Sequence, residues 1–252
     1  MSASLTGKMA VVTGAANGIG RASALRLAQD GASIALLDRD REALDEVAGE
    51  IRATGREVQA FALDCTDSDA VVATFAEISQ RYGHVDILVN NVGQGSRDRM
   101  QPFLSTNLET LEFQMAINLK TCIVCSHQVV KAMAARGYGK IINMTSESAV
   151  NGSLQCWDYS AVKAGVIGFT RALAREMAPY HVNVNAIGPG ATRTRALDLV
   201  PAELMKKIIA GIPMQRIGEP EEIANAVSFF AGSQSDYITG QTLLVNGGNW
   251  ML

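Results

Sequence analysis

The amino-acid sequence predicts an α/β protein with a doubly wound sheet of seven mostly parallel strands and helices on both faces. Segments with strand patterns alternate with segments of helical spacing, and this alternation is typical of a parallel sheet that is covered on both sides. The strand patterns lie near residues 8–13, 33–38, 57–63, 85–90, 139–146, 182–188 and 241–246. The helical patterns lie near residues 19–30, 40–54, 67–82, 107–136, 157–179, 196–211 and 220–231. A chain of 252 residues with 48% apolar residues suits one domain spanning 1–252.

The first strand and the first helix are joined by a glycine-rich turn. Residues 8–13 form an apolar run with the length of a buried strand. Gly14, Gly18 and Gly20 follow in a G-x3-G-x-G spacing, and helical spacing begins directly afterwards. Glycines let the backbone approach a pyrophosphate, and a helix N-terminus offers it free N–H groups. This context favours a Rossmann-type dinucleotide site over an ordinary strand–helix turn.

The second strand, near residues 33–38, ends in Asp38. An acidic residue ~20 positions after the glycines can accept hydrogen bonds from ribose hydroxyls, and its charge repels a 2′-phosphate. Asp38 therefore favours NAD over NADP, although Arg39 and Arg41 are near enough in sequence to receive such a phosphate. Alternatively, Asp38 is the N-cap of the helix near 40–54, and one side chain could serve both roles.

The helical pattern near residues 157–179 carries Tyr159 and Lys163. Their i, i+4 spacing places the phenol and the ammonium on one face of a helix. A free phenol has a pKa near ~10, and a nearby cation lowers that pKa because it favours the phenolate. The pair is therefore a candidate proton-transfer device. The alternative is a half-buried tyrosine beside a solvated lysine.

These motifs, together with others in the same order, resemble the short-chain dehydrogenase/reductase family over nearly the whole chain. The resemblance rests on residues 13–20, 64, 85–93, 115–119, 140–146, 159–163, 187–194 and 237–248. It implies that the catalytic residues are Ser146, Tyr159, Lys163 and Asn118. It also implies that the dinucleotide is bound by Gly14, Asn17, Gly18, Ile19, Gly20, Asp38, Arg39, Asp64, Cys65, Asn91, Val92, Gly93, Tyr159, Lys163, Pro189, Gly190, Thr192 and Thr194.

The resemblance implies an NAD-dependent oxidoreductase that interconverts a secondary alcohol and a ketone by hydride transfer. Tyr159 would exchange the alcohol proton, and Lys163 would lower the tyrosine pKa and hold the nicotinamide ribose. Ser146 would hydrogen-bond the substrate oxygen, and Asn118 would hold a water in a proton relay.

Two positions depart from the family pattern, because Val92 replaces the usual alanine and Asn246 stands where aspartate is more common. Two other functions are alternatives to this oxidoreductase. A 3-oxoacyl-[carrier protein] or acyl-CoA reductase using NADPH is disfavoured by Asn17 and Asp38. A non-catalytic dinucleotide-binding regulator is disfavoured because the four catalytic residue types are all present.

Two segments resemble the variable substrate wall of the family, namely residues 94–102 and a flap near 191–211. They hold Arg97, Arg99, Arg193 and Arg195, and guanidinium groups suit carboxylate, phosphate or sulfonate. One interpretation is an anionic or polyhydroxylated substrate, such as a sugar, sugar acid, ring diol, hydroxy acid or sulfonate. The other assigns these arginines to solvent, ion pairs or the cofactor. The candidate substrate contacts are Gln94, Arg97, Ser146, Trp157, Tyr159, Arg193 and Arg195.

The composition narrows the range of partners. The net charge is −3 and no apolar run approaches the ~20 residues of a membrane span. Residues 1–8 hold no secretory apolar segment. We therefore expect a cytoplasmic location, a small-molecule substrate, and neither nucleic acid nor membrane as a partner. The spacing of Cys122 and Cys125 favours two buried thiols over a metal site, so no metal is expected. The resemblance further implies a homotetramer or homodimer, formed through the helices near 107–136 and 157–179.

Overall fold

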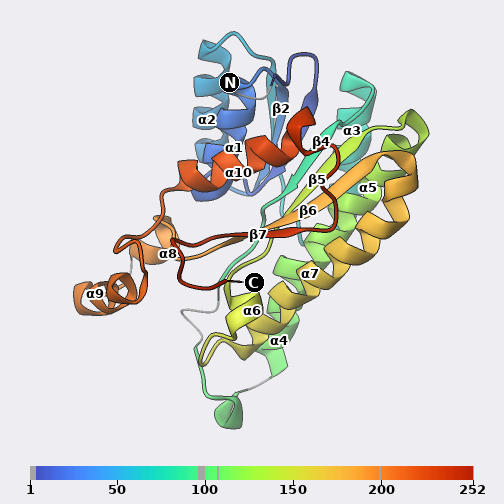
Figure 1. Ribbon diagram of the computed structural model, residues 1–252. Helices are drawn as coiled ribbons and strands as arrows, with labels where there is room; N and C mark the ends of the chain where they lie inside the picture. The colour runs from blue at the N-terminus through green and yellow to red at the C-terminus, as the bar shows by residue number, and fades with distance from the viewer. Residues whose placement is uncertain (1–3, 96–99, 107, 199, 252) are drawn as a thin grey trace.

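The structure is a computed structural model that describes residues 4–95, 100–106, 108–198 and 200–251 (Figure 1). One sheet holds seven strands in the order β3-β2-β1-β4-β5-β6-β7, and each neighbouring pair is parallel. The strands are β1 Met9–Thr13, β2 Ser33–Asp38, β3 Val58–Ala62, β4 Ile87–Asn90, β5 Gly139–Met144, β6 Val182–Pro189 and β7 Thr242–Val245. The predicted doubly wound α/β fold is confirmed.

Ten α-helices lie in the part of the chain that the structure describes. They are α1 Gly18–Gln29, α2 Arg41–Ala53, α3 Ser68–Tyr82, α4 Leu108–Gln114, α5 Thr121–Arg136, α6 Ser148–Asn151, α7 Trp157–Met177, α8 Arg195–Asp198, α9 Ala202–Gly211 and α10 Pro220–Ala231. Short 3₁₀ turns occupy Phe103–Ser105, Ala178–Tyr180 and Ser233–Ser235. None of these helices is long and apolar enough to cross a membrane.

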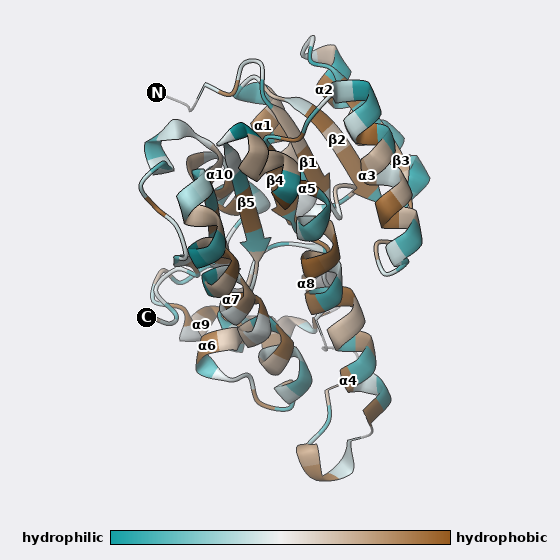
Figure 2. Cartoon of the chain, turned by 90° about the vertical axis from the view of Figure 1, so that its right-hand side faces the viewer, coloured by the Kyte–Doolittle hydropathy of each residue, from teal (hydrophilic) through white to brown (hydrophobic). Residues whose placement is uncertain are grey.

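Alternate residues of each central strand enter two separate cores. In β1, Ala10 and Val12 pack with buried residues of α1, α2 and α10, whereas Met9 and Val11 pack with α3, α5 and α7. Successive side chains of a strand point to opposite faces, so a strand covered on both sides must be apolar throughout. Figure 2 shows this distribution, with mostly apolar residues in β1 and β2 and a mixture of apolar and polar residues along α2.

Two helical patterns differ from the sequence prediction. The pattern near 107–136 is not one regular helix, because Met115–Lys120 between α4 and α5 forms wider π-helical turns. Such turns are rare and occur often at functional sites. The pattern near 196–211 forms two helices, α8 and α9, separated around Pro201. Proline lacks the N–H that a helix interior needs, so it interrupts the helical pattern.

The strand order places the predicted site residues at one edge of the sheet. The chain moves outward from β1 to β2 and β3, then returns to place β4 on the other side of β1. In such sheets ligands bind beyond the carboxyl ends of the strands, where the order reverses. The segments that follow β1, β4, β5 and β6 meet at this edge.

Candidate active site

The glycine turn between β1 and α1 is closely packed. A Cβ atom on Gly20 would lie 1.9 Å from the carbonyl oxygen of Gly14, so only glycine fits at position 20. The cap residue of α1, Asn17, makes no side-chain hydrogen bond to the helix, so it leaves the N–H groups of the first turn to another acceptor. A Cβ atom on Gly18 would lie 3.1 Å from Cγ2 of Thr194, so the flap faces this turn closely. The turn can hold an anionic group at the helix N-terminus.

Thr13 and Asn91 join the glycine turn to the end of β4. The Thr13 hydroxyl accepts hydrogen bonds from the backbone N–H groups of Asn91 at 3.0 Å and Val92 at 3.1 Å. The Asn91 amide donates to the carbonyl oxygens of Thr13 and Gly14, both at 3.1 Å. Thr13 was not predicted as a site residue, although it begins the glycine motif. Its hydroxyl fixes two strand ends against each other.

Asp38 supports the same turn from the end of β2. Its carboxylate accepts hydrogen bonds from the backbone N–H groups of Ala16 and Asp40, both at 3.1 Å. The N-cap of α2 is Asp40, whose side chain accepts from the N–H of Ala43. The interpretation of Asp38 as the helix N-cap is therefore wrong. Its charge instead lies against the glycine turn, at the backbone N–H of Ala16.

Two further predicted cofactor residues follow β3. Asp64 accepts hydrogen bonds from the backbone N–H and the hydroxyl of Thr66, both at 2.8 Å. These bonds, the backbone one first, lower the pKa of the Asp64 carboxyl, and Arg39 adds to the effect. Burial raises the pKa of the Cys65 thiol to about 12. The Cys65 side chain belongs to the core that α3, α5 and α7 cover, so it is held inside the protein.

Lys163 is a buried cation at the carboxyl end of β5. Its side chain is buried and its ammonium donates to the carbonyl oxygen of Met144 at 2.9 Å. Burial lowers the pKa of Lys163 from its ordinary value of 10.5 to about 8, against an opposing effect of the nearby Cys122. The ammonium lies 5.8 Å from the ring centroid of Tyr159, which is half-buried in the first turn of α7. The alternative of a solvated lysine is wrong.

Ser146 lies two residues after β5 ends and follows Thr145, which bonds to the backbone of Lys163. Its hydroxyl accepts a hydrogen bond from the N–H of Ser148 at 3.2 Å, and the residue is 9% exposed. The hydroxyl of Thr145 donates to the carbonyl oxygen of Lys163 at 2.7 Å. The end of β5 is therefore tied to α7 at the lysine, which fixes the distance between Ser146 and Lys163.

Asn118 and Gly93 complete this edge. The Asn118 side chain accepts from the N–H of Gln94 at 3.2 Å and donates to its carbonyl oxygen at 3.1 Å and to Oε1 of Gln114 at 2.5 Å. A Cβ atom on Gly93 would lie 2.5 Å from Oδ1 of Asn118 and 3.0 Å from Nζ of Lys163. Asn118 thus positions the segment after β4, while its role in a proton relay stays a prediction.

A buried amide network lies beneath these residues. The Asn90 amide donates to the hydroxyl of Ser126 at 2.9 Å and to Oδ1 of Asn143 at 2.8 Å. The Asn143 amide donates to the hydroxyl of Thr170 at 2.9 Å. These bonds join β4, β5, α5 and α7, the four elements that carry or support the predicted proton-transfer residues. The network was not predicted from the sequence. The pattern that could have indicated it is an asparagine within each of two apolar strands.

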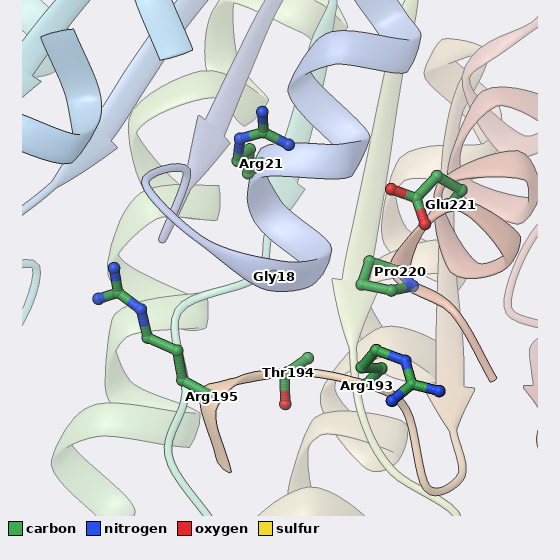
Figure 3. Close-up of a pocket in the computed structure, with 7 residues that line it drawn as sticks. All are labelled: Gly18, Arg21, Arg193, Thr194, Arg195, Pro220 and Glu221. Carbon is green, nitrogen blue, oxygen red and sulfur yellow. The ribbon is translucent and has the colours of Figure 1, made fainter. Parts of the chain in front are cut away.

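The flap arginines lie beside the glycine turn. A pocket of about 250 Å³ is lined by Gly18, Arg21, Arg193, Thr194, Arg195, Pro220 and Glu221 (Figure 3). Arg193 donates to the Glu219 carboxylate at 3.0 Å, and Arg195 lies 3.7 Å from the Asp40 carboxylate. These pairs support the interpretation that assigns Arg193 and Arg195 to ion pairs and the cofactor side. Arg97 and Arg99 lie outside the described residues.

Two aromatic side chains pack together near the start of α7. Trp157 is half-buried and packs edge to face with Phe103, with ring centroids 5.0 Å apart. The N–H of Gln101 donates to the carbonyl oxygen of Gln155 at 3.2 Å, which joins the segment before Phe103 to the loop before α7. Phe103 was not predicted. It adds a second ring beside Trp157, one of the predicted substrate contacts.

The cysteines are buried thiols. Cys122 and Cys125 lie on α5 and are buried, as predicted, and burial raises the pKa of both. Cys122 donates to Oδ1 of Asn143 at 3.3 Å, so it packs against the amide network. In the described part of the chain, no group of three or more His, Cys, Asp or Glu side chains is arranged to hold a metal ion.

Comparison with known proteins covers almost the whole chain. Residues 14–249 match the family model described as Enoyl-(Acyl carrier protein) reductase. The 3-oxoacyl-[acyl-carrier-protein] reductase FabG of Thermotoga maritima is 35% identical over 97% of this chain and 98% of its own length. Nodulation protein G of Azospirillum brasilense is 39% identical, over 96% of this chain and 97% of its own. The solved structure of a putative gluconate dehydrogenase from Agrobacterium tumefaciens is similar with a TM-score of 0.93, at 33% identity and 98% coverage of both chains.

Proposed function

Because this chain belongs to the short-chain dehydrogenase/reductase family, we propose that it is an NAD-dependent oxidoreductase that interconverts a secondary alcohol and a ketone. The observation that carries this proposal is the buried ammonium of Lys163, 5.8 Å from the Tyr159 ring at the edge that also holds Ser146. A buried cation beside a phenol stabilises the phenolate, which is the form that can take a proton.

The residues at this edge fit a dinucleotide. The glycine turn would hold the pyrophosphate, because Asn17 leaves the first-turn N–H groups of α1 to another acceptor and Gly20 keeps the turn tight. Asp38 would accept hydrogen bonds from the ribose at the end of β2. When bound, the nicotinamide ring supplies or accepts the hydride.

The remaining chemistry belongs to side chains of this protein. Tyr159 takes the hydroxyl proton of the alcohol during oxidation and returns it to the oxygen during reduction. Ser146 donates a hydrogen bond to the substrate oxygen and stabilises the charge that develops there. Lys163 stabilises the Tyr159 phenolate, and its bond to the Met144 carbonyl holds it in place. Asn118 and Gly93 keep the segment after β4 close to this group.

The choice of NAD rests on Asp38. Both of its carboxylate oxygens accept backbone N–H groups, one from Ala16 and one from Asp40, so the charge is held at the end of β2. A 2′-phosphate at this place would face a fixed negative charge, whereas ribose hydroxyls would donate to it. Arg39 is exposed and Arg41 is paired with Asp45 at 2.9 Å.

Reduction of a 3-oxoacyl thioester with NADPH is the second candidate. Its support is the name of several relatives, 35% to 38% identical in sequence, that are 3-oxoacyl-[acyl-carrier-protein] reductases. Asp38 argues against NADPH in this chain. The two candidates share the proton-transfer residues, so the cofactor preference and the substrate distinguish them.

The test is a steady-state assay that follows NADH or NADPH absorbance. Purified protein is given NAD with matched secondary alcohols, each neutral or bearing a carboxylate, phosphate or sulfonate, and NADH or NADPH with a 3-oxoacyl thioester. We expect turnover of an alcohol with NAD, and kcat/KM for NAD at least ~10-fold above that for NADP, which corresponds to about 1.4 kcal/mol. Turnover only with NADPH and the thioester contradicts the proposal and supports the second candidate.

A further inference from the structure

Glu147, the residue after Ser146, binds the C-terminal tail, defined here as residues 246–251. Its two carboxylate oxygens each accept a hydrogen bond from the amide of Asn249, both at 3.1 Å. Oε2 also accepts from the amide of Asn246 at 3.1 Å. The backbone N–H of Glu147 donates to the carbonyl oxygen of Pro189 at 3.1 Å, so the residue is held at the end of β6. One carboxylate therefore links the serine segment to a region about a hundred positions away in the sequence.

The tail itself is folded around Asn246. The Asn246 amide donates to the carbonyl oxygen of Trp250 at 2.9 Å, and its Oδ1 accepts from the N–H of Gly248 at 3.2 Å. Gly247 and Gly248 both have positive φ angles, +64° and +81°, which only glycine adopts readily. Trp250 follows this turn and its side chain is 46% exposed. Figure 1 shows this end beside α6, the helix that follows Ser146.

The tail also contacts residues 212–214, which directly follow α9 and are called here the end of the flap. The carbonyl oxygen of Gly247 accepts from the N–H of Met214 at 3.2 Å. A Cβ atom on Gly247 would lie 2.8 Å from Cγ2 of Ile212, so tail and flap pack without a gap. A Cβ atom on Gly190 would lie 2.7 Å from Cβ of Asn246 and 3.2 Å from Oε2 of Glu147. The tail is thus fixed on one side to the serine segment and on the other to the residues after α9.

The residue types at these positions are matched. An ionised carboxylate only accepts hydrogen bonds, and an asparagine amide supplies two donors. The family pattern more often has aspartate at position 246, and that carboxylate would face Glu147 at hydrogen-bond distance. Two carboxylates sharing one place repel each other. The departure at Asn246 is therefore complementary to Glu147.

We propose that Glu147, Asn246 and Asn249 form a clasp that positions the C-terminal tail and the end of the flap as the substrate-side wall next to Ser146. The three are positioning residues, and their effect on catalysis rests on the proposed oxidoreductase function. Breaking the clasp frees the tail and widens the substrate site. The affinity for substrate then falls, while the proton-transfer residues keep their places.

A charge-exchange series tests this proposal. Asn246→Asp places two carboxylates together and removes the donor to the Trp250 carbonyl. Glu147→Gln with Asn246→Asp restores one carboxylate facing one amide with the partners reversed, and the bond to Trp250 is lost in both variants, so the difference between them reports the contact between positions 147 and 246. We expect Asn246→Asp to raise KM for the alcohol about tenfold with kcat changed less than about threefold, because a hydrogen bond to a charged group is lost. The double variant should return KM to within about threefold of wild type.

Fluorescence gives a readout that does not depend on turnover. The chain has two tryptophans, so Trp157→Phe leaves Trp250 as the sole reporter of the tail. In that background Asn246→Asp should shift the emission to longer wavelength and raise acrylamide quenching, and the double variant should reverse both changes. Unchanged fluorescence in Asn246→Asp, or a double variant no better than the single one, overturns the clasp.

The two proposals fail in different ways. If the fluorescence series behaves as expected but KM stays within about twofold of wild type in all variants, the clasp exists and its role as a substrate wall is overturned. If the wild-type protein turns over none of the alcohols, the proposed function fails, and the fluorescence series still decides whether the clasp forms. Cofactor affinity, measured by NADH fluorescence titration, should change less than about threefold in every clasp variant.

Discussion

The region around Lys163 and the region around the flap arginines hold their charges in opposite ways. Lys163 is buried, bonds to the Met144 carbonyl and lies against Gly93, where no additional atom fits. Arg193 and Arg195 are exposed and pair with carboxylates on other surface segments. A buried charge depends strongly on its surroundings because water cannot replace a lost partner, whereas an exposed ion pair exchanges with water at little cost.

This difference separates chemistry from recognition. The proposed proton-transfer group lies on strand ends and a long helix that are joined by a buried amide network, so its geometry is fixed by the core. The backbone of the flap is held by the bond of the Arg193 N–H to the Gly218 carbonyl and by the buried Leu197, but the arginine side chains are exposed, so these side chains can adjust to a bound molecule. We therefore expect substitutions around Lys163 to have large effects on turnover and stability, and substitutions of the flap arginines to have small ones.

The largest effect is expected for Tyr159→Phe. Removing the hydroxyl removes the group that exchanges the alcohol proton, so kcat should fall about 10³-fold. The ring remains, so NADH affinity should stay within about twofold of wild type. Steady-state kinetics and NADH fluorescence titration measure the two quantities. Near-wild-type turnover would show that Tyr159 takes no part in the mechanism. The contrast between the region around Lys163 and the flap arginines would then fail as well.

Lys163 gives a pH-dependent effect on stability. Its pKa falls from 10.5 in its ordinary state to about 8 in the folded protein. The unfolded chain therefore binds more protons than the folded one between pH 8 and 10.5. Below pH 8 the buried charge opposes folding in full, and this cost disappears as the pH rises to 10.5.

Comparison with Lys163→Met isolates this titration. The free energy of unfolding of the wild type, minus that of the variant, should rise by about 3 kcal/mol between pH 8 and 10.5. Urea unfolding of both proteins without cofactor measures the difference at each pH, and contributions from other groups cancel. A difference that stays constant over this range shows that Lys163 titrates at its ordinary value and is not buried as described.

A matched pair of glycines tests the packing beside Lys163. A Cβ atom on Gly93 would lie 2.5 Å from Oδ1 of Asn118, whereas a Cβ atom on Gly95 would have no heavy atom of the described structure within 4 Å. Gly93→Ala should lower the free energy of unfolding by about 1–3 kcal/mol through overpacking, and lower kcat because Lys163 and Asn118 are displaced. Gly95→Ala should change neither property. Equal effects of the two substitutions on thermal unfolding and kcat would refute the packing argument.

The sequence predicts the parts of this site that local spacing determines. The glycine turn, Asp38 at a strand end, and Tyr159 with Lys163 on one helix face each follow from a few neighbouring residues. The contacts that hold the site together join distant positions. Asn91 and Thr13 are 78 positions apart, Gln94 and Asn118 are 24 apart, and Glu147 and Asn249 are 102 apart. No local pattern connects such residues.

Two of the corrections have the same origin. Asp38 has the residue type of an N-cap and lies near the predicted helix, but the helix begins two residues later than a cap at Asp38 requires, and Asp40 takes that role while Asp38 accepts from Ala16. The pattern near 107–136 predicts one helix because apolar spacing tolerates a wider turn. The π-helical turns place Asn118 where its side chain can meet the Gln94 backbone. Tertiary contacts decide both outcomes.

The smallest effect is expected at Arg195. Its guanidinium lies 3.7 Å from the Asp40 carboxylate, and both side chains are exposed to solvent. An exposed ion pair contributes about 0–1 kcal/mol, so Arg195→Ala should change KM for any alcohol and the Kd of NADH by less than about threefold. Arg41→Ala is the matched control, because Arg41 forms an exposed pair with Asp45 on α2.

An anionic substrate would change this outcome. If Arg195 leaves Asp40 to grip a carboxylate or phosphate on the substrate, Arg195→Ala raises KM for the anionic alcohols about tenfold or more and leaves KM for neutral ones unchanged. The defect would also shrink at high salt, because an exposed charge pair is screened. A selective loss of this kind would show that Arg195 binds the substrate. It would also show that an exposed arginine on the flap can contribute as much to substrate recognition as the buried residues around Lys163 contribute to catalysis.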